Sequence, residues 1–329
     1  MSRLLLRDLT DISQDEDRRW DEIAAIAQLP DPQSCGSAWQ LTAFACSRRS
    51  GAPVVLRQTR DSQIAFALTL ALRGCHFGPL EAHWNFGSPV LGPDGVALLV
   101  DCIQQLRKDL KPEQLQISVP GLEPGGRHAR QIDKAFPNVR TRNQNPQASA
   151  SLEGGIEGWL SRRSRNFRHN LKRAQRRAND AGIWFERKSP RTETEAAACY
   201  DRMLKVEQRS WKGPAREGLL ALSKFYRMLL IAYAERDAAR VVFARRDEED
   251  VGFCFGGARF GVYRGQQTSY SEQVARLSIG TLMHFETAKW LAEDGASLQH
   301  FGPVEHMMLY KASFCEAESP SVVKTILIR

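Results

Sequence analysis

Signals for secondary structure occur twice in the same order along the chain, and this repeat restricts the possible folds more than any other feature. Residues 54–72 and 241–258 each hold two apolar, β-branched runs around a short polar turn, which is typical of a β-hairpin. A glycine turn follows each hairpin, at 92–95 and at 278–280, and apolar positions at helical spacing follow each turn. This common order predicts an internal duplication of one α/β module.

Further strand and helix signals alternate in both halves. We expect additional strands at 115–119, 265–272, 297–301 and 322–328. A short helical segment is expected at 306–314. The polar, proline-containing stretch 140–149 predicts a linker between the halves. Strands that alternate with helices imply an α/β fold.

Composition is that of an ordinary globular protein. Of the 329 residues, 42% are hydrophobic and 26% are charged. Only Leu4 to Leu6 are apolar before charges resume, which is too short for a signal peptide or a membrane span, so a cytoplasmic location is expected. The seven cysteines never form a CxxC pair, and neither a disulfide framework nor a metal site is expected.

The formal net charge of +8 is concentrated in one segment. Residues 161–182 are rich in arginine and lysine, while Phe167, Leu171, Ala174 and Ala178 form one narrow apolar stripe at helical spacing. This predicts a helix that packs by one face. Its basic face is either simply solvated or contacts RNA, an acidic acceptor or the phosphates of a cofactor. Nucleic acid is the less favoured partner because exposed aromatic residues for stacking are absent from the segment.

The turn from Ala275 to Thr281 lies between a predicted strand and a predicted helix. The first amides of a helix lack intrahelical partners and face a positive dipole end, so this turn can hold an anion, and Gly280 permits close approach. Arg276 could add charge. The alternative interpretation is an ordinary N-cap by Ser278. No GxxxxGK[ST], GxGxxG, GxSxG or HExxH pattern occurs, so an NTPase and a dinucleotide oxidoreductase are not supported.

Taken together, these segments resemble the CelD/BcsL-like acetyltransferases, a branch of the GNAT superfamily that is related to the Fem-type aminoacyl transferases. Four stretches carry the resemblance: SRRSRNFRHNLKRAQRR after Leu160, VEQRSWKG at 206–213, ARLSIGTLMHFETAKWLAEDG at 275–295 and FGPVEHMMLYKASF at 301–314. The resemblance extends from about residue 20 to Phe314 and is firmest from Trp159 to Lys311.

The resemblance implies tandem GNAT-like lobes, each a mixed, mostly antiparallel sheet flanked by helices. Residues 1–150 would be a degenerate lobe, 151–182 a basic connecting helix and 183–329 the catalytic lobe. An acyl-CoA would place its pantetheine between two splayed parallel strands and its pyrophosphate on the turn made by Arg276, Ser278, Ile279, Gly280 and Thr281. In the first lobe Pro93 replaces an amide donor, so no cofactor is expected there.

The implied reaction is direct attack by a primary amine of a small molecule on the thioester of an acyl-CoA, with no metal. Tyr310 is the candidate acid for the departing thiolate, and Glu207 and Glu272 rank first as the base. The substrate-binding candidates that match the family's motifs are Trp211, Lys212 and Lys311. Other possible bases are His284, Glu286, Glu305 and His306.

Two positions depart from the family pattern. His300-Phe301-Gly302 lacks the acidic residue that relatives often carry before the glycine, and Met307-Met308 suggests room for a longer acyl chain. The alternatives are a Fem-like transferase that uses aminoacyl-tRNA and a non-catalytic GNAT-like binding or scaffold protein. Segment 200–236 is too short for the long helical arm usual in Fem-like enzymes. The acceptor amine, the acyl length, the pathway and the oligomeric state are not encoded in any recognisable motif.

Overall fold

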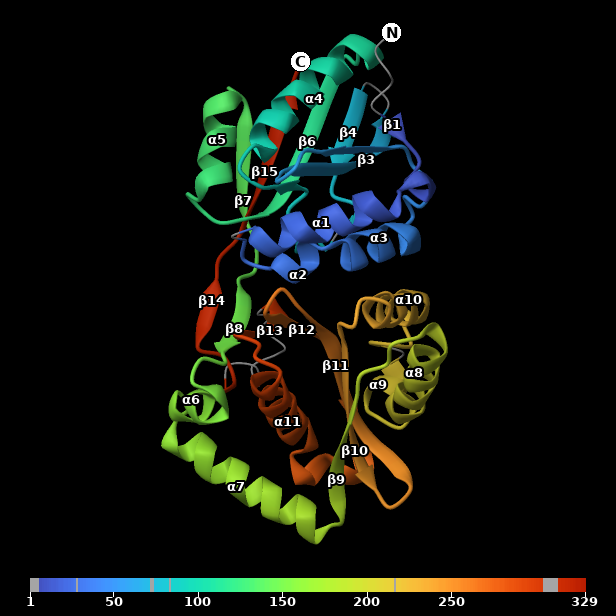
Figure 1. Cartoon of the computed structure of the whole chain (residues 1–329), viewed down its shortest axis with the longest axis vertical. Helices are drawn as coiled ribbons and strands as arrows, with labels where there is room; N and C mark the ends of the chain where they lie inside the picture. Colours follow the sequence, from blue (N-terminus) through green and yellow to red (C-terminus); the bar gives the residue numbers. More distant parts are fainter. Residues whose placement is uncertain (1–5, 28, 72–73, 83, 216, 304–312) are drawn as a thin grey trace. The chain divides into compact units, whose positions relative to one another are not determined.

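The structure, a computed structural model, describes residues 6–27, 29–71, 74–82, 84–215, 217–303 and 313–329. The chain forms two compact units (Figure 1). Unit 1 consists of residues 1–147 and 319–329, and unit 2 consists of residues 148–318.

Unit 1 contains a mixed sheet with the strand order β1-β2-β3-β4-β6-β15-β7. Neighbouring strands are antiparallel, except that β4 and β6 are parallel. The strands are β1 (Leu6–Arg7), β2 (Val54–Gln58), β3 (Gln63–Ala71), β4 (Gly74–Gly78), β6 (Gln114–Leu122), β7 (Val139–Asn143) and β15 (Val322–Ile328), with β5 (Val90–Leu91) paired to β3. The helices are η1 (Leu9–Asp11), α1 (Gln14–Ile26), α2 (Pro32–Cys35), α3 (Ser37–Cys46), α4 (Gly95–Leu110) and α5 (Arg127–Ala135).

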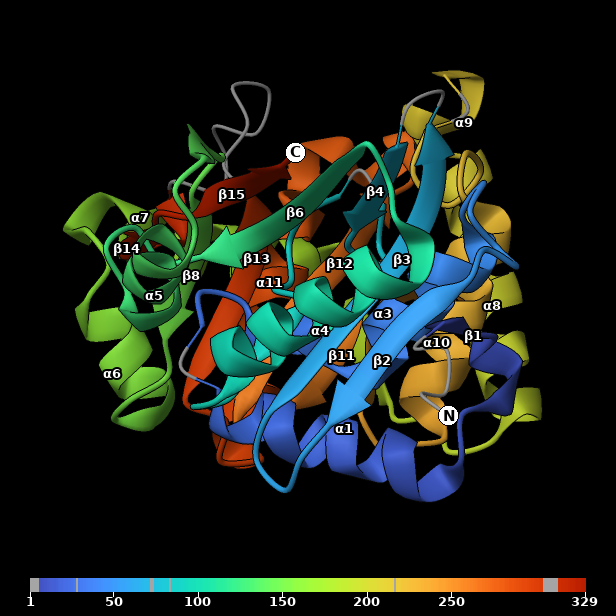
Figure 2. The ribbon, with the colours of Figure 1, turned by 90° about the horizontal axis from the view of Figure 1, so that it is seen from above.

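Helices cover both faces of the sheet of unit 1. Helix α4 lies on one face, and α1 and α3 lie on the other (Figure 1, Figure 2). The stripe predicted for α4 faces the sheet: Leu99, Ile103 and Leu106 are buried together with Phe66 and Ile117. This apolar burial is what fixes α4 against the sheet.

Unit 2 contains a second mixed sheet, with the strand order β14-β8-β13-β12-β11-β10-β9. Its strands are β8 (Gln147–Ser151), β9 (Ile183–Lys188), β10 (Ala239–Arg246), β11 (Glu249–Arg259), β12 (Val262–Tyr270), β13 (Leu298–Pro303) and β14 (Ala317–Ser319). Its helices are α6 (Gly155–Ser161), α7 (Arg165–Asp180), α8 (Glu193–Gln208), α9 (Lys212–Ala215), α10 (Ser223–Ala234), η2 (Glu272–Leu277) and α11 (Ile279–Glu293).

The sheet of unit 2 is also covered on both faces. Helices α6, α7 and α11 lie on one side, and α8, α9 and α10 lie on the other (Figure 1). The predicted stripe of α7 is confirmed, because Leu171, Ala174 and Ala178 are buried against β9, β10 and α11. Phe167 packs beside them against Trp159 of α6.

The two units repeat one order of elements. In unit 1 the hairpin β2–β3 leads to β4, α4 and the parallel strand β6, and in unit 2 the hairpin β10–β11 leads to β12, α11 and the parallel strand β13. The predicted fold class is therefore confirmed: both sheets are mixed and mostly antiparallel, and helices flank them.

Two expectations about the ends of the units were wrong. The strand predicted at 322–328 forms, but as β15 it lies between β6 and β7 of unit 1 instead of within a lobe that runs from 183 to 329. The expected linker 140–149 consists largely of β7 and β8, which belong to different sheets. β7 and β8 find their strand partners far away in sequence, at 298–328, so the polar composition of 140–149 was a poor guide.

Candidate functional site

The parallel pairing of β12 and β13 stops partway along β12. Among the described residues the register runs from Val262 opposite Leu298 to Arg264 opposite His300, and β12 then continues to Tyr270 beside β11 alone. A bulge at this point adds one extra residue, Gln266, to β12. Strands thus form where they were expected, at 265–272 and 297–301, as β12 and β13, and the parallel pairing between them covers only the first three residues of each.

The expected anion-binding turn lies at the N-terminus of α11. The first intrahelical bond runs from the Leu282 N–H to the Ser278 carbonyl at 3.2 Å, so the amides of Ile279, Gly280 and Thr281 precede it. Ser278 has a left-handed backbone with φ of 59°, and its side chain makes no capping hydrogen bond. The alternative interpretation, an ordinary Ser278 cap, is therefore wrong, and the first amides of α11 have no intrahelical partner, as at any helix N-terminus.

Two arginines lie near this turn. Arg276, at the end of η2, is exposed. Arg177, in the last turn of α7, donates to the Ser278 hydroxyl at 3.4 Å. This contact lies between the C-terminal end of α7, the basic helix, and the turn that begins α11.

Glu207 is fully buried near the end of α8. Its carboxylate accepts a short hydrogen bond from the Leu219 N–H, and its second oxygen lies 4.0 Å from the Lys212 ammonium nitrogen. Burial raises the pKa of the Glu207 carboxyl, while the Lys212 charge and the Leu219 N–H oppose the rise. A buried carboxyl with a raised pKa is a candidate for proton transfer.

Lys212 connects this carboxylate to the unpaired part of β12. Its ammonium donates to the Gln267 side chain and to the Thr268 carbonyl, both at 2.9 Å. Gln267 in turn donates to the Tyr226 hydroxyl of α10 at 2.7 Å. Burial lowers the pKa of Lys212, which Glu207 opposes, and raises the pKa of Tyr226.

Gln267 and Tyr226 had no signal in the sequence. Neither belongs to a recognisable motif, and they meet only because β12 packs against α10 in the fold. We call the group made by Glu207, Lys212, Tyr226 and Gln267 the α8-face cluster.

The other predicted residues are distributed differently. Glu272 is exposed at the start of η2, and its backbone N–H donates to the Arg209 carbonyl at 3.2 Å, which brings it to the end of α8. Trp211 is 53% exposed, with the Lys212 ammonium 5.8 Å from the centre of its ring. Tyr310 and Lys311 lie outside the described residues, as do Glu305 and His306.

His284, a lower-ranked base candidate, lies on the opposite face of the sheet. It is buried on α11 between Phe301 and Phe314, with its ring nitrogens 3.5 Å from the Thr268 hydroxyl and 3.9 Å from the Cys254 sulfur. Glu286 forms an ion pair with Arg187. Both side chains therefore have structural partners away from the α8-face cluster.

In unit 1 the chain itself packs against the continuation of β6, the counterpart of β13. β6 continues beyond Ile117, its last residue paired with β4. Segment 86–88 packs so closely there that a Cβ on Gly121 would come within 2.8 Å of its backbone. The buried Glu81 carboxylate fixes this segment by accepting from the Gly87 N–H at 2.7 Å.

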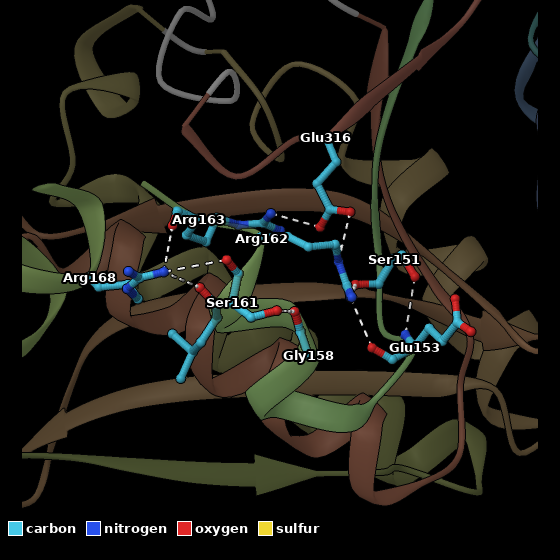
Figure 3. Close-up of polar contacts among 9 residues, drawn as sticks. Ser151, Glu153, Gly158, Ser161, Arg162, Arg163, Arg168 and Glu316 are labelled. Carbon is cyan, nitrogen blue, oxygen red and sulfur yellow. Dashed lines mark hydrogen bonds and ion pairs between the residues drawn. The ribbon is translucent and has the colours of Figure 1, made fainter. Parts of the chain in front are cut away.

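Much of the basic segment has internal partners. Arg162 and Arg163 both form ion pairs with Glu316, at 2.9 Å and 2.7 Å (Figure 3). The buried Arg163 guanidinium also stacks over Trp159. Arg168 points the other way and donates to three backbone carbonyls at the end of α6 and just beyond it, those of Leu160, Ser161 and Arg163 (Figure 3). These arginines hold α6, α7 and the segment around β14 together.

A cavity of about 750 Å³ lies in unit 1, between α4, residues 135–138 and the end of β15, and no predicted site residue lines it. The described residues contain no group of three or more His, Cys, Asp or Glu side chains placed to hold a metal ion. Within the same residues, no helix combines the length and apolarity needed to cross a membrane.

Comparison with known proteins finds a family model that matches most of unit 2. Residues 165–311 match the family model of the acetyltransferase (GNAT) domain. No curated protein matches the chain in sequence. Residues 165–311 therefore carry a GNAT-type acyltransferase domain.

Solved structures share the fold of the whole chain at low sequence identity. A conserved protein of unknown function from Bacteroides thetaiotaomicron VPI-5482 is 10% identical with a TM-score of 0.66, and 98% of this chain and 99% of that chain are covered. FemX is 12% identical with a TM-score of 0.63, covering 95% and 96%. L-PGS from Bacillus licheniformis is 15% identical with a TM-score of 0.57, covering 91% and 92%. The similarity to FemX confirms the expected relation to the Fem-type fold.

The raised pKa of Glu207 predicts a pH dependence of stability. A carboxyl whose folded-state pKa exceeds its unfolded value, here near 4.5, binds more protons when folded, so the free energy of unfolding falls as pH rises through that interval. We expect Glu207→Gln, which cannot ionise, to gain stability relative to the wild type as pH rises from 4.5. Denaturant titrations across this range measure the difference, and one that stays constant or shrinks would contradict the assignment. Glu272→Gln, at an exposed site, is the control.

Proposed function

We propose that the protein is an acyl-CoA-dependent N-acyltransferase that transfers the acyl group to a primary amine of a small molecule. The observation that carries the proposal is that the β12–β13 pairing ends at Arg264 and His300, after which β12 leads through η2 to the amides at the start of α11. An extended pantetheine arm can add to a strand edge through backbone hydrogen bonds, as peptides do, while the diphosphate binds the helix terminus.

The donor would bind in unit 2 and not in unit 1. In unit 1 residues 86–88 cover the strand edge, and Pro93 lies where an amide would be needed. Arg276, Ser278, Ile279, Gly280 and Thr281 would form the diphosphate site. The reaction needs no metal in this proposal.

The acceptor would approach from the side of the α8-face cluster. Its nitrogen attacks the thioester carbonyl, the C–N bond forms and the C–S bond breaks, so that an amide and a free CoA thiol result. Glu207 would receive the proton that the amine loses, directly or through water, and Tyr310 would give a proton to the departing thiolate. Lys212 holds the unpaired end of β12 through the Thr268 carbonyl, and we place Trp211 and Lys311 at the acceptor.

The cellular setting proposed is the cytoplasm. All seven cysteines are free thiols in the structure, which is the usual state in a reducing compartment. A Fem-like reaction with aminoacyl-tRNA is the competing proposal, since the fold is shared with FemX. The experiments below separate the two donors.

Thermal unfolding with acetyl-CoA, longer acyl-CoAs and free CoA tests the donor site. A ligand at 100 times its dissociation constant stabilises the native state by about 2.7 kcal/mol, so the midpoint should rise. Gly280→Pro removes one amide donor within the first turn, where proline is tolerated, and should abolish the rise. Gly280→Ala keeps the amide and should retain it. A midpoint that no CoA compound shifts would favour the aminoacyl-tRNA donor or a non-catalytic role.

Steady-state kinetics test the proposed acid and base. Tyr310→Phe and Glu207→Gln should each lower kcat by about 10²-fold or more, the usual contribution of a positioned acid or base, with little change in KM for acyl-CoA. Glu272→Gln, the other ranked base, should remain active. A Tyr310→Phe enzyme with unchanged kcat across pH would remove Tyr310 from the mechanism. An active Glu207→Gln paired with an inactive Glu272→Gln would exchange their roles.

A further inference from the structure

The basic segment separates into paired cations and cations left without a carboxylate. Arg162, Arg163, Arg187 and Lys188 form ion pairs, and Arg168 binds backbone carbonyls. Five exposed cations of α7 form no ion pair within the described part of the chain: Arg165, Lys172, Arg173, Arg176 and Arg177. We call these five residues the α7 basic face. Asp180, in the last position of α7, is the only acid on the helix.

The α7 basic face is extended and leads toward the α11 turn. Arg165 and Arg177 are twelve residues apart, which corresponds to about 18 Å along an α-helix. Arg173 and Arg177 lie one helical turn apart on the same side, because residues i and i+4 are neighbours on a helix. Arg177 already touches Ser278, so this side of α7 is next to the amides of Ile279, Gly280 and Thr281.

This arrangement raises the free energy of the protein when no anion is bound. Like charges spaced three or four residues apart on a helix repel each other, and no carboxylate on α7 is interleaved among these cations. Arginine forks bind phosphate oxygens through charge-assisted hydrogen bonds, which are stronger than neutral ones. A ligand carrying several phosphate charges would therefore remove the repulsion and gain these bonds.

The kinds of side chain that α7 exposes distinguish between classes of anionic ligand. Phe167 packs inward on Trp159 and Phe314, so the exposed side of α7 offers no Phe, Tyr or Trp ring for stacking unpaired RNA bases, and His169 is its one exposed ring. The apolar residues Leu171, Ala174 and Ala178 are also buried, so no outward apolar face is available to enter a lipid surface. A compact, multiply phosphorylated small molecule fits what remains.

We propose that Arg173 and Arg177 bind the phosphate groups of the nucleotide end of CoA, with Arg177 beside the diphosphate and Arg173 toward the 3′-phosphate. Arg165, Lys172 and Arg176 supply a positive field that attracts the same groups. The inference rests on the proposed function and extends it, because it assigns recognition of the donor's nucleotide to a helix outside the α11 turn.

Calorimetric titration with CoA and with 3′-dephospho-CoA tests this assignment in the full chain. The variant is Arg173→Gln with Arg177→Gln, and the matched control is Arg140→Gln with Arg142→Gln, which removes the same charge from exposed positions of β7 in unit 1. We expect the Kd of CoA to rise about tenfold or more in the variant, since two charge-assisted bonds are lost. The rise should be smaller for 3′-dephospho-CoA, and the control should bind both as the wild type does.

Each other outcome overturns the proposal in a distinct way. Equal Kd values for CoA in the variant and the wild type would show that α7 does not contact the donor, while leaving the donor site at the α11 turn intact. Unchanged CoA binding with loss of a salt-dependent affinity for duplex RNA would assign the α7 basic face to RNA. Absence of CoA binding in the wild type would overturn both this proposal and the proposed function.

Discussion

β12 has β11 beside it along its whole length, but in the part of the chain that the structure describes β13 pairs with it only as far as Arg264, and the arrangement of unit 2 follows from that difference. Backbone groups that a neighbouring strand would satisfy need other partners beyond this point. Lys212 provides one by binding the Thr268 carbonyl, and the bulge at Gln266 redirects the strand. β12 then leads through η2 into α11, so the unpaired edge and the helix terminus are consecutive along the chain. The edge of β12 beyond Arg264 and the N-terminus of α11 thus supply the two parts of the proposed donor site.

The same order of elements in unit 1 serves a different purpose. There, residues 86–88 fill the edge of β6, and Glu81 holds them in place through the Gly87 N–H. A substituent at Gly121 would collide with this segment, so the close packing depends on a glycine at that position. The two units show how one α/β module can either keep a strand edge for a ligand or cover it with its own chain. In unit 2 the α8-face cluster joins α8, α10 and β12 around the buried Glu207 carboxylate.

Local patterns were sufficient to predict the hairpins at 54–72 and 241–258, the helix that begins at Ile279 and the apolar stripe of α7, because each depends on periodicity within a short window. The placement of β15 was not predictable in this way, since its pairing with β6 and β7 spans almost the whole chain. Glu207 could be named from its motif, but its burial could not, because residues from α8, the following loop and β12 surround it only after folding. Tyr226 and Gln267 were missed for the same reason. The left-handed Ser278 also escaped prediction, because serine before a helix usually indicates an ordinary cap.

Hydrogen exchange of backbone amides, measured with and without acetyl-CoA, tests the central claim most directly, because it reports which strand edge and which helix terminus the donor covers. The account predicts slower exchange at residues 265–270 and 279–281 of unit 2 on addition of acetyl-CoA, with exchange at 86–95 of unit 1 unchanged. Protection confined to unit 1, or exchange that acetyl-CoA leaves unaltered throughout unit 2, would contradict it.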